Sequence, residues 1–191
     1  YALSKVMEET LCRQFGIQYD LPYTILRLSW LWADDDSLAH LLLPEPNFGV
    51  PDWRELADTP ERRSFFEQKR PGVACLRHPG GAPYIRHVVA VEDAVSAFLV
   101  ALEQPTARGE TFNIAASAPV DYAELARYAG QRLKLPVVDF ELDGFHDFSI
   151  DTAKAQSRLG WHPERDGLAM IDAALAFREA GGKRETVRYQ G

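Results

Sequence analysis

The sequence predicts an α/β fold built on parallel strands. Segments with the composition of strands alternate with segments of helical periodicity through the middle of the chain, an order typical of parallel α/β folds. The apolar run 23–28 follows Pro22 and is typical of a buried parallel strand. The chain has 191 residues, 46% of them hydrophobic, which is enough for one domain with a substantial core.

The first part of the chain predicts a helix, a strand and a loop. Apolar residues at helical spacing predict a helix from about residue 3 to 15, which Gly16 would end. The strand 23–28 comes next. The aromatic stretch 30–32 then leads into a polar loop formed by three aspartates at 34–36.

Proline marks the following segment. Residues 44–60 hold four of the twelve prolines, which predicts either irregular loop or a lid. Thr59 is expected to cap a helix that has Pro60 at its first position and runs to about Lys69. The remaining predicted elements are two strands around the turn 78–81, at 73–76 and 84–89, further strands at 111–115 and 137–142, and helices at 94–102, 121–133, 151–160 and 167–180.

Charge and composition exclude several classes of protein. The formal net charge is -7 and no basic stripe exists to meet phosphates, so we expect no nucleic-acid partner. No apolar run approaches the length of a membrane span, and no signal-peptide pattern opens the chain, so we expect no membrane partner and a cytoplasmic location. Cys12 and Cys75 are isolated, and the five histidines are scattered, so no metal site is predicted.

Tyr1 and Lys5 are candidate catalytic residues. Positions i and i+4 share one face of a helix, so both side chains can point at one site. A neighbouring ammonium favours the phenolate form of a tyrosine, and such a tyrosine can give or take a proton. The pair alone is a weak signal, because this spacing arises by chance and an exposed helical turn is the better explanation of these two residues taken alone.

Four segments in this order resemble the C-terminal half of the extended short-chain dehydrogenase/reductase family, the NAD-dependent epimerases and dehydratases. Tyr1 to Lys5 opens a long helix, as the family's Y-x-x-x-K does. Residues 27–34 are similar to R-P-x-x-V-Y-G-P, and residues 86–94 to R-D-F-V-H-V-D-D-V. Residues 151–163 resemble D-x-S-K-A-x-x-x-L-G-W-x-P. Together the four segments span nearly the whole chain.

The resemblance implies the C-terminal part of a Rossmann-type, doubly wound parallel sheet with a small α/β substrate-binding subdomain. It implies NAD or NADP as cofactor, Tyr1 as general acid/base and Lys5 as the residue that holds the nicotinamide ribose. Ser29 and Trp30 would lie beside the nicotinamide, beyond the end of their strand. Arg86 and Trp32 would contact substrate, although Arg86 is equally well explained as a solvated strand residue.

The resemblance also implies a division into two parts and a partner. Residues 1–40 and 84–118 would complete the dinucleotide-binding domain, and residues 41–83 and 119–191 would form the substrate-binding subdomain. The family's Gly-rich phosphate loop would lie upstream, since the chain contains no such turn. The expected partners are a small-molecule substrate and, through the first helix of the intact protein, a second copy.

Several departures from the family argue against a nucleotide-sugar substrate. Leu28, Ala33 and Asp34 stand where the family has Pro, Gly and Pro. The aspartates at 34–36 put negative charge near the expected site, and a like charge disfavours a pyrophosphate, although a solvated acidic turn is the simpler explanation of these residues. The family's second phosphate-binding arginine is missing from residues 144–149.

The predicted function is hydride transfer at a hydroxyl-bearing, sugar-like carbon, carried out by the intact protein and not by this chain alone. One alternative is a non-catalytic relative that senses a dinucleotide or serves as a scaffold, and another is an independent binding module. Structural roles are expected for the other polar candidates: Asp93 as a helix cap, Trp161 packing the subdomain against the sheet, Asn113 bonding nearby backbone, and His87 and His146 as satisfied polar residues.

Overall fold

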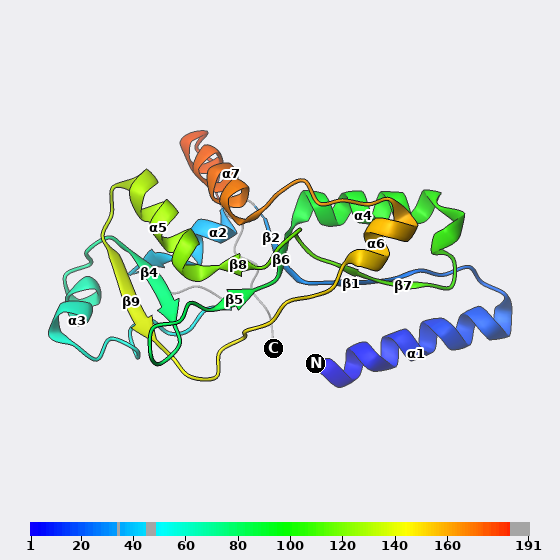
Figure 1. Cartoon of the computed structure of the whole chain (residues 1–191), viewed down its shortest axis with the longest axis horizontal. Helices are drawn as coiled ribbons and strands as arrows, with labels where there is room; N and C mark the ends of the chain where they lie inside the picture. Colours follow the sequence, from blue (N-terminus) through cyan, green and yellow to red (C-terminus); the bar gives the residue numbers. More distant parts are fainter. Residues whose placement is uncertain (34, 45–48, 184–191) are drawn as a thin grey trace.

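The computed structural model describes residues 1–33, 35–44 and 49–183 and has an α/β fold. The molecule is elongated and its elements gather toward the two ends of its long axis (Figure 1). At one end, helices α1 (Ala2–Tyr19), α4 (Val91–Glu103) and α6 (Ala153–Leu159) surround strands β1 (Ile25–Leu28) and β7 (Thr111–Ile114).

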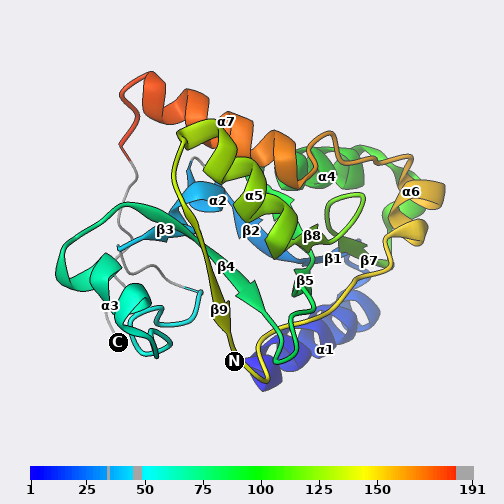
Figure 2. The same cartoon turned by 60° about the vertical axis from the view of Figure 1, so that its left-hand side comes forward.

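The other end is built around strands β4 and β9. Figure 2 shows α5 across one face of this pair, with α3 near its edge. The elements of this end are β3 (Leu42–Leu43), β4 (Gly72–Arg77), β9 (Val137–Glu141), α2 (Asp36–Ala39), α3 (Pro60–Glu67), α5 (Tyr122–Leu133) and α7 (Gly167–Glu179). Three short strands connect the two ends: β2 (Trp30–Trp32), β5 (Ile85–Arg86) and β6 (Val88–Ala90).

The strands form four small sheets in the described part of the chain. Strands β1 and β7 pair in parallel, as do β2 and β6, so the predicted parallel pairing of segment 23–28 is confirmed. Strand β4 lies between β3, which is antiparallel to it, and β9, which is parallel. Strand β5 pairs in antiparallel fashion with β8 (Val120–Asp121). No single continuous sheet joins these pairs among the described residues.

Two apolar cores correspond to the two ends. The larger core lies between β3, β4, β9 and helices α2, α3, α5 and α7, and the smaller joins β7, α4 and α6. Trp161 is buried in the smaller core, where its Nε1 donates to Ser96 Oγ at 2.8 Å. It therefore packs α4 and the segment after α6 together. The division of the chain into two domains at the predicted bounds stays a prediction.

Two predictions, of where the first helix ends and of how deeply the first strand is buried, were wrong because tertiary packing decides both. Helix α1 does not end at Gly16 but continues to Tyr19, and Asp20, with a left-handed φ of 51°, terminates it. A Cβ on Gly16 would lie 2.5 Å from the Tyr23 ring, so the glycine permits close approach and does not end the helix. Strand β1 is only partly buried, because it pairs on one edge and Arg27 is exposed.

The predicted polar loop at 34–36 was also wrong over its described part, because Asp36 begins helix α2. Asp35 is buried and its carboxylate accepts from Arg178 of α7 at 2.7 Å. Asp36 Oδ2 accepts from the backbone N–H of Ala33 at 2.9 Å. Asp34 lies outside the described residues. The contact between Asp35 and Arg178 joins α2 to α7, and no local sequence pattern indicates that these two helices pack together.

The predicted strand 84–89 is divided at His87, and its two parts pair with different partners. Asp93 does not cap its helix. Its carboxylate instead accepts from the backbone N–H groups of Glu164 and Arg165, at 3.0 and 3.1 Å. Asn113 has the expected structural role, although the carbonyl that it bonds, that of Asp151, is remote in sequence.

Helices α1 and α4 turn apolar side chains outward. Helix α4 packs with its small residues, among them Ala94, Ala97 and Ala101, and exposes larger ones, namely Val95, Phe98, Leu99 and Leu102. Helix α1 has no buried residue, and its apolar stripe, namely Leu3, Val6, Met7, Leu11 and Phe15, is exposed. The two helices lie on opposite sides of the β1–β7 pair (Figure 1).

Candidate functional site

Tyr1 and Lys5 lie together at the start of α1. The Lys5 Nζ is 5.5 Å from the centre of the Tyr1 ring, so the pair shares one helix face as predicted. Tyr1 is 97% exposed, and Lys5 forms an exposed ion pair with Glu8 at 2.9 Å. The Glu8 carboxylate raises the pKa of Lys5 above its usual value, first through this hydrogen bond. Lys5 therefore stays positively charged beside the phenol.

Helix α1 is fixed to the β1–β7 pair by polar contacts. Glu9 accepts from Arg27 of β1 at 2.6 and 2.7 Å and from Arg13 at 2.9 Å. Arg13 also donates to Thr111 of β7 at 3.3 Å. The Arg27 guanidinium, more than Arg13, lowers the pKa of Glu9 to about 2. The N-terminal end of α1, which carries Tyr1, points toward the middle of the long axis (Figure 1).

Ser29 lies between β1 and β2, where its backbone N–H donates to the Ile114 carbonyl at 2.9 Å. Its side chain is buried, and the hydroxyl has no hydrogen-bond partner in the described part of the chain. A buried hydroxyl without a partner costs free energy, so Ser29 keeps an unused donor and acceptor at the junction of the two strands.

Trp30, Trp32 and His40 form an aromatic cluster at β2. Trp30 meets Trp32 edge-on at 5.9 Å between ring centres and His40 at 4.3 Å. Trp32 stacks on His40 at 5.5 Å and is buried. A Cβ on Gly49 would lie only 2.2 Å from Trp30, so the backbone at Gly49 lies directly against this ring.

Arg86 lies against the Trp30 ring of this cluster. The Arg86 Cζ atom lies 3.9 Å from the centre of the Trp30 ring and 5.7 Å from that of Phe145, both within cation–π range. Its Nη1 makes a long contact of 3.4 Å with the Gly49 carbonyl. Burial lowers the pKa of Arg86 somewhat, while the Tyr122 hydroxyl acts in the opposite direction. Arg86 is thus half-buried and not a freely solvated strand residue.

Hydrogen bonds hold residues 142–150 alongside β5 and the residues that flank it. The Tyr84 hydroxyl donates to the Leu142 carbonyl at 2.5 Å, and the Phe148 N–H donates to the Ile85 carbonyl at 3.2 Å. The Ile150 N–H donates to His87 Nδ1, while His87 Nε2 is buried without a partner among the described residues. His87 is therefore only half satisfied, contrary to expectation. These contacts hold Phe145 beside Arg86.

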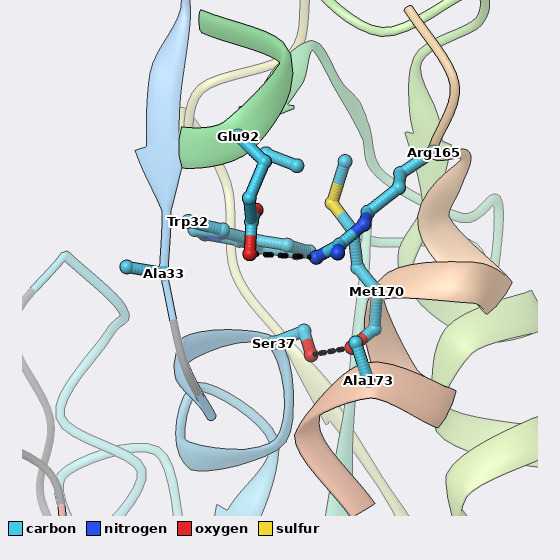
Figure 3. A pocket seen from close by; sticks show the side chains of 8 residues that line it. Trp32, Ala33, Ser37, Glu92, Arg165, Met170 and Ala173 are labelled. Carbon is cyan, nitrogen blue, oxygen red and sulfur yellow. Dashed lines mark hydrogen bonds and ion pairs between the residues drawn. The ribbon is translucent and has the colours of Figure 1, made fainter. Parts of the chain in front are cut away.

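A small pocket lies next to Trp32. Figure 3 shows the Glu92–Arg165 ion pair, 2.9 Å long, beside the Trp32 ring, and Ser37 donating to the Met170 carbonyl at 2.9 Å. The volume of about 10 Å³ is no more than one water molecule needs. Trp32 packs between α4 and α7 here, and a substrate contact for it stays a prediction.

The predicted site residues fall into two groups. One group is the cluster of Trp30, Trp32 and Arg86. The other is the pair Tyr1 and Lys5, and no hydrogen bond or ion pair in the described structure joins this pair to the cluster. Sequence reasoning missed Gly49, Tyr122 and Phe145. No local signal marks their proximity to Arg86, because each lies on a different segment.

The described residues contain no group of three or more His, Cys, Asp or Glu side chains that could hold a metal ion. No described helix is long and apolar enough to cross a membrane.

Several solved structures share the fold of this chain. No family model matches the chain, and no curated protein matches it. Solved structures do match. A short-chain dehydrogenase/reductase superfamily protein from Agrobacterium tumefaciens with bound NAD superposes with a TM-score of 0.72 at 23% identity, over 95% of this chain and 58% of that one.

Two further matches are enzymes by their descriptions. UDP-glucose 4-epimerase from Thermotoga maritima superposes with a TM-score of 0.62 at 20% identity, over 94% of this chain and 53% of that one. The dTDP-glucose 4,6-dehydratase from Bacillus anthracis, in complex with NAD, gives 0.60 at 16% identity, over 94% and 52%. The chain therefore has the fold of part of these proteins and spans little more than half their length.

Proposed function

We propose that this chain is the C-terminal part of an NAD(P)-dependent epimerase, dehydratase or reductase of the extended short-chain dehydrogenase/reductase family. The observation that carries the proposal is the Tyr1–Lys5 pair, exposed on one face at the start of α1. The matched structures support it, since they share the fold and several are described as epimerases or dehydratases. The parallel pairs β1–β7 and β2–β6 would belong to the Rossmann-type sheet, with α1 and α4 covering opposite faces.

The residues present fit the nicotinamide end of the cofactor. Lys5 would hold the ribose, because its partner Glu8 is exposed and such a pair exchanges easily with solvent or ligand. The buried, unpartnered Ser29 hydroxyl and the Trp30 backbone would lie beside the nicotinamide. The cofactor, when bound, supplies the hydride acceptor or donor. The phosphates require a Gly-rich turn that the chain does not contain.

Tyr1 would move the proton at the hydroxyl-bearing carbon of the substrate. Its ring is exposed, so its hydroxyl is free to meet a ligand, and the Lys5 ammonium lies 5.5 Å from the centre of the ring. Arg86 and Trp32 would contact the substrate, with Arg86 supplying the positive charge. The resemblance to the family suggests a small, sugar-like substrate with a hydroxyl group.

The test is turnover of the intact protein with Tyr1→Phe, measured as change in nicotinamide absorbance over a panel of sugars. Loss of a general acid/base typically lowers turnover by about 10²- to 10⁴-fold, and cofactor affinity should stay nearly unchanged. Tyr19→Phe, at the exposed far end of the same helix, is the matched control. Undiminished turnover in Tyr1→Phe would refute the proposed role. An intact protein that binds NAD(P) but turns nothing over would favour the non-catalytic alternative.

A further inference from the structure

Residues 142–150 form a strap that runs alongside β5. Every residue of the strap is exposed or half-buried, so polar contacts hold it and apolar burial contributes little. The Tyr84 hydroxyl donates to the Leu142 carbonyl and accepts from the Phe145 N–H at 3.3 Å. A segment held in this way opens locally at a lower free-energy cost than unfolding of the whole chain. The strap is therefore able to detach while both cores stay packed.

The last contact of the strap is with His87, which lies between β5 and β6. His87 is 4% exposed, its Nδ1 accepts from the Ile150 N–H, and its Nε2 has no hydrogen-bond partner among the described residues. An imidazole nitrogen that accepts must be unprotonated, so this contact requires a neutral His87 with its proton on Nε2. Protonation would set one N–H against another and would leave a buried charge without an acceptor.

The segments around His87 offer no free counter-charge among the described residues. Strand β2 and residues 115–119 carry no titratable side chain. The charged residues on the other flanking segments have partners of their own, namely Arg86 on the Trp30 ring, Glu92 on Arg165, Asp93 on the backbone at 164–165, Asp121 on the first N–H groups of α5, Asp151 on the Ala153 N–H and Lys154 on Glu110. A proton on His87 is therefore not compensated while the strap is attached.

A second histidine holds the strap in the opposite protonation state. His78 Nε2 lies 2.9 Å from one carboxylate oxygen of Asp147, and the other oxygen accepts from the Ile85 N–H at 3.2 Å. A protonated imidazole attracts a carboxylate more strongly than a neutral one does. Acidification therefore strengthens the contact at Asp147 while it breaks the contact at Ile150.

We propose that the strap is a pH-sensitive element: neutral His87 holds residues 148–150 against the strands, and protonation of His87 releases them while His78 keeps Asp147 in place. Release frees the Ile85 carbonyl from the Phe148 N–H and loosens the segment that places Phe145 beside Arg86. The inference goes beyond the proposed function and does not depend on it, because it concerns contacts within this chain.

Linkage gives the direction of the effect. Burial lowers the pKa of His87 in the attached state, and the backbone at Ala116 acts in the opposite direction. A solvated histidine titrates near pH 6.5. The contribution of the contact is thus fully present above about pH 6.5 and is lost as the pH falls through the depressed pKa. One proton changes the opening equilibrium by at most about tenfold per pH unit.

The test is hydrogen exchange of the 191-residue chain, followed by mass spectrometry between about pH 5 and 8, with labelling times scaled for the intrinsic pH dependence of exchange. The amides of Phe148 and Ile150 report on the strap, and those of β4 report on global unfolding. Exchange at 148–150 should be at least about tenfold faster than at β4 and should rise by up to about tenfold per pH unit below about pH 6.5. It should also be insensitive to dilute urea, because local opening exposes little surface.

Three variants assign the effect to particular residues. His87→Asn keeps an acceptor and removes the titration, so exchange at 148–150 should no longer rise on acidification. His146→Asn removes a titrating group from an exposed position of the strap itself and should change nothing. His78→Gln removes the charge that opposes release, so the strap should open several-fold further at low pH than in the wild type.

Three outcomes would overturn the inference. They are exchange at 148–150 that is independent of pH, a pH dependence that His87→Asn retains, and exchange of the strap at the same rate as β4, which would mean that the strap opens only with the whole chain. If His87→Asn folds poorly, the wild-type pH profile, its urea dependence and the comparison with β4 still decide. No further opening in His78→Gln would overturn the role given to His78.

Discussion

The Arg86 guanidinium lies 3.9 Å above the centre of the Trp30 ring, and the backbone at Gly49 presses against the same ring. Arg86 and Trp30 belong to strands β5 and β2, which pair with different partners. Their contact therefore joins separate parts of the fold at the place where substrate recognition is proposed. Any side chain at position 49 would collide with the Trp30 ring, so the stack of Arg86 on Trp30 also depends on Gly49.

Gly49→Ala should destabilise the chain by about 2–4 kcal/mol, from overpacking and backbone strain together. The added Cβ would lie 2.2 Å from Trp30, and the residue has a φ of +83°. Chemical unfolding followed by tryptophan fluorescence measures the loss. Gly144→Ala is the control, because it has a φ of +77° and nothing within 4 Å of its Cβ, so it carries the strain without the clash. Equal losses in the two variants would show that Trp30 moves aside freely.

Stability should fall as the pH drops below about 6.5, in part because of His87. Burial lowers the pKa of His87, and its Nδ1 must be unprotonated to accept from Ile150 N. The unfolded chain then binds more protons than the folded one, so the contribution of His87 is present above the unfolded pKa and is lost on acidification through the folded pKa.

His87→Asn keeps an acceptor and removes the titration, so its stability should depend less steeply on pH below 6.5, by at most about 1.4 kcal/mol per pH unit. His162→Asn, at an exposed position, is the control. Denaturant unfolding at several pH values gives both slopes. Identical slopes for wild type and His87→Asn would contradict the assignment.

The isolated chain should show no measurable affinity for NAD or NADP. Dinucleotide phosphates are bound by backbone donors of a Gly-rich turn and a helix N-terminus, and the sequence holds no such turn. Calorimetric titration of residues 1–191 with each dinucleotide is the measurement. Micromolar binding would mean that the proposed role of an upstream half is mistaken.

The isolated chain should also associate with itself. Strand β1 has one paired edge in the described structure, and α4 exposes Phe98, Leu99 and Leu102 at 48%, 56% and 84%. An open edge beside exposed apolar surface promotes association. Dynamic light scattering should show large species, and Leu99→Glu should reduce them, whereas Glu103→Gln, on the same helix, should not. A clean monomer with a sharp melt would refute the prediction.

The intact protein should be a homodimer that pairs through α1, whose apolar stripe is exposed. Leu11→Glu should then convert dimer to monomer, because it places a charge in the middle of that stripe. Cys12→Glu adds the same charge at an exposed position of the same helix outside the stripe and is the control. Light scattering coupled to size exclusion distinguishes the two states. A wild-type protein that is monomeric at all concentrations would exclude the interface.

Local patterns predicted most of the elements, because helix and strand formation depend on near neighbours. Thr59 and Asp121 cap the helices that they were expected to cap, with side-chain oxygens accepting from backbone N–H groups two or three residues on. The same reasoning located β7 and β9 and identified the α/β class. Boundaries were less exact, as at Gly16, where contact with Tyr23 overrides the usual helix-ending role of glycine.

By itself, then, the sequence determined most of the longer helices and strands, the α/β class and the candidate pair Tyr1–Lys5, since each depends on residues a few positions apart. Tertiary structure alone decided that Asp93 holds the backbone at 164–165 and that Arg86 meets Trp30 and Tyr122. Those contacts join segments that are tens of residues apart. Their geometry follows from the packing of the whole chain, and no periodicity or spacing in the sequence records it.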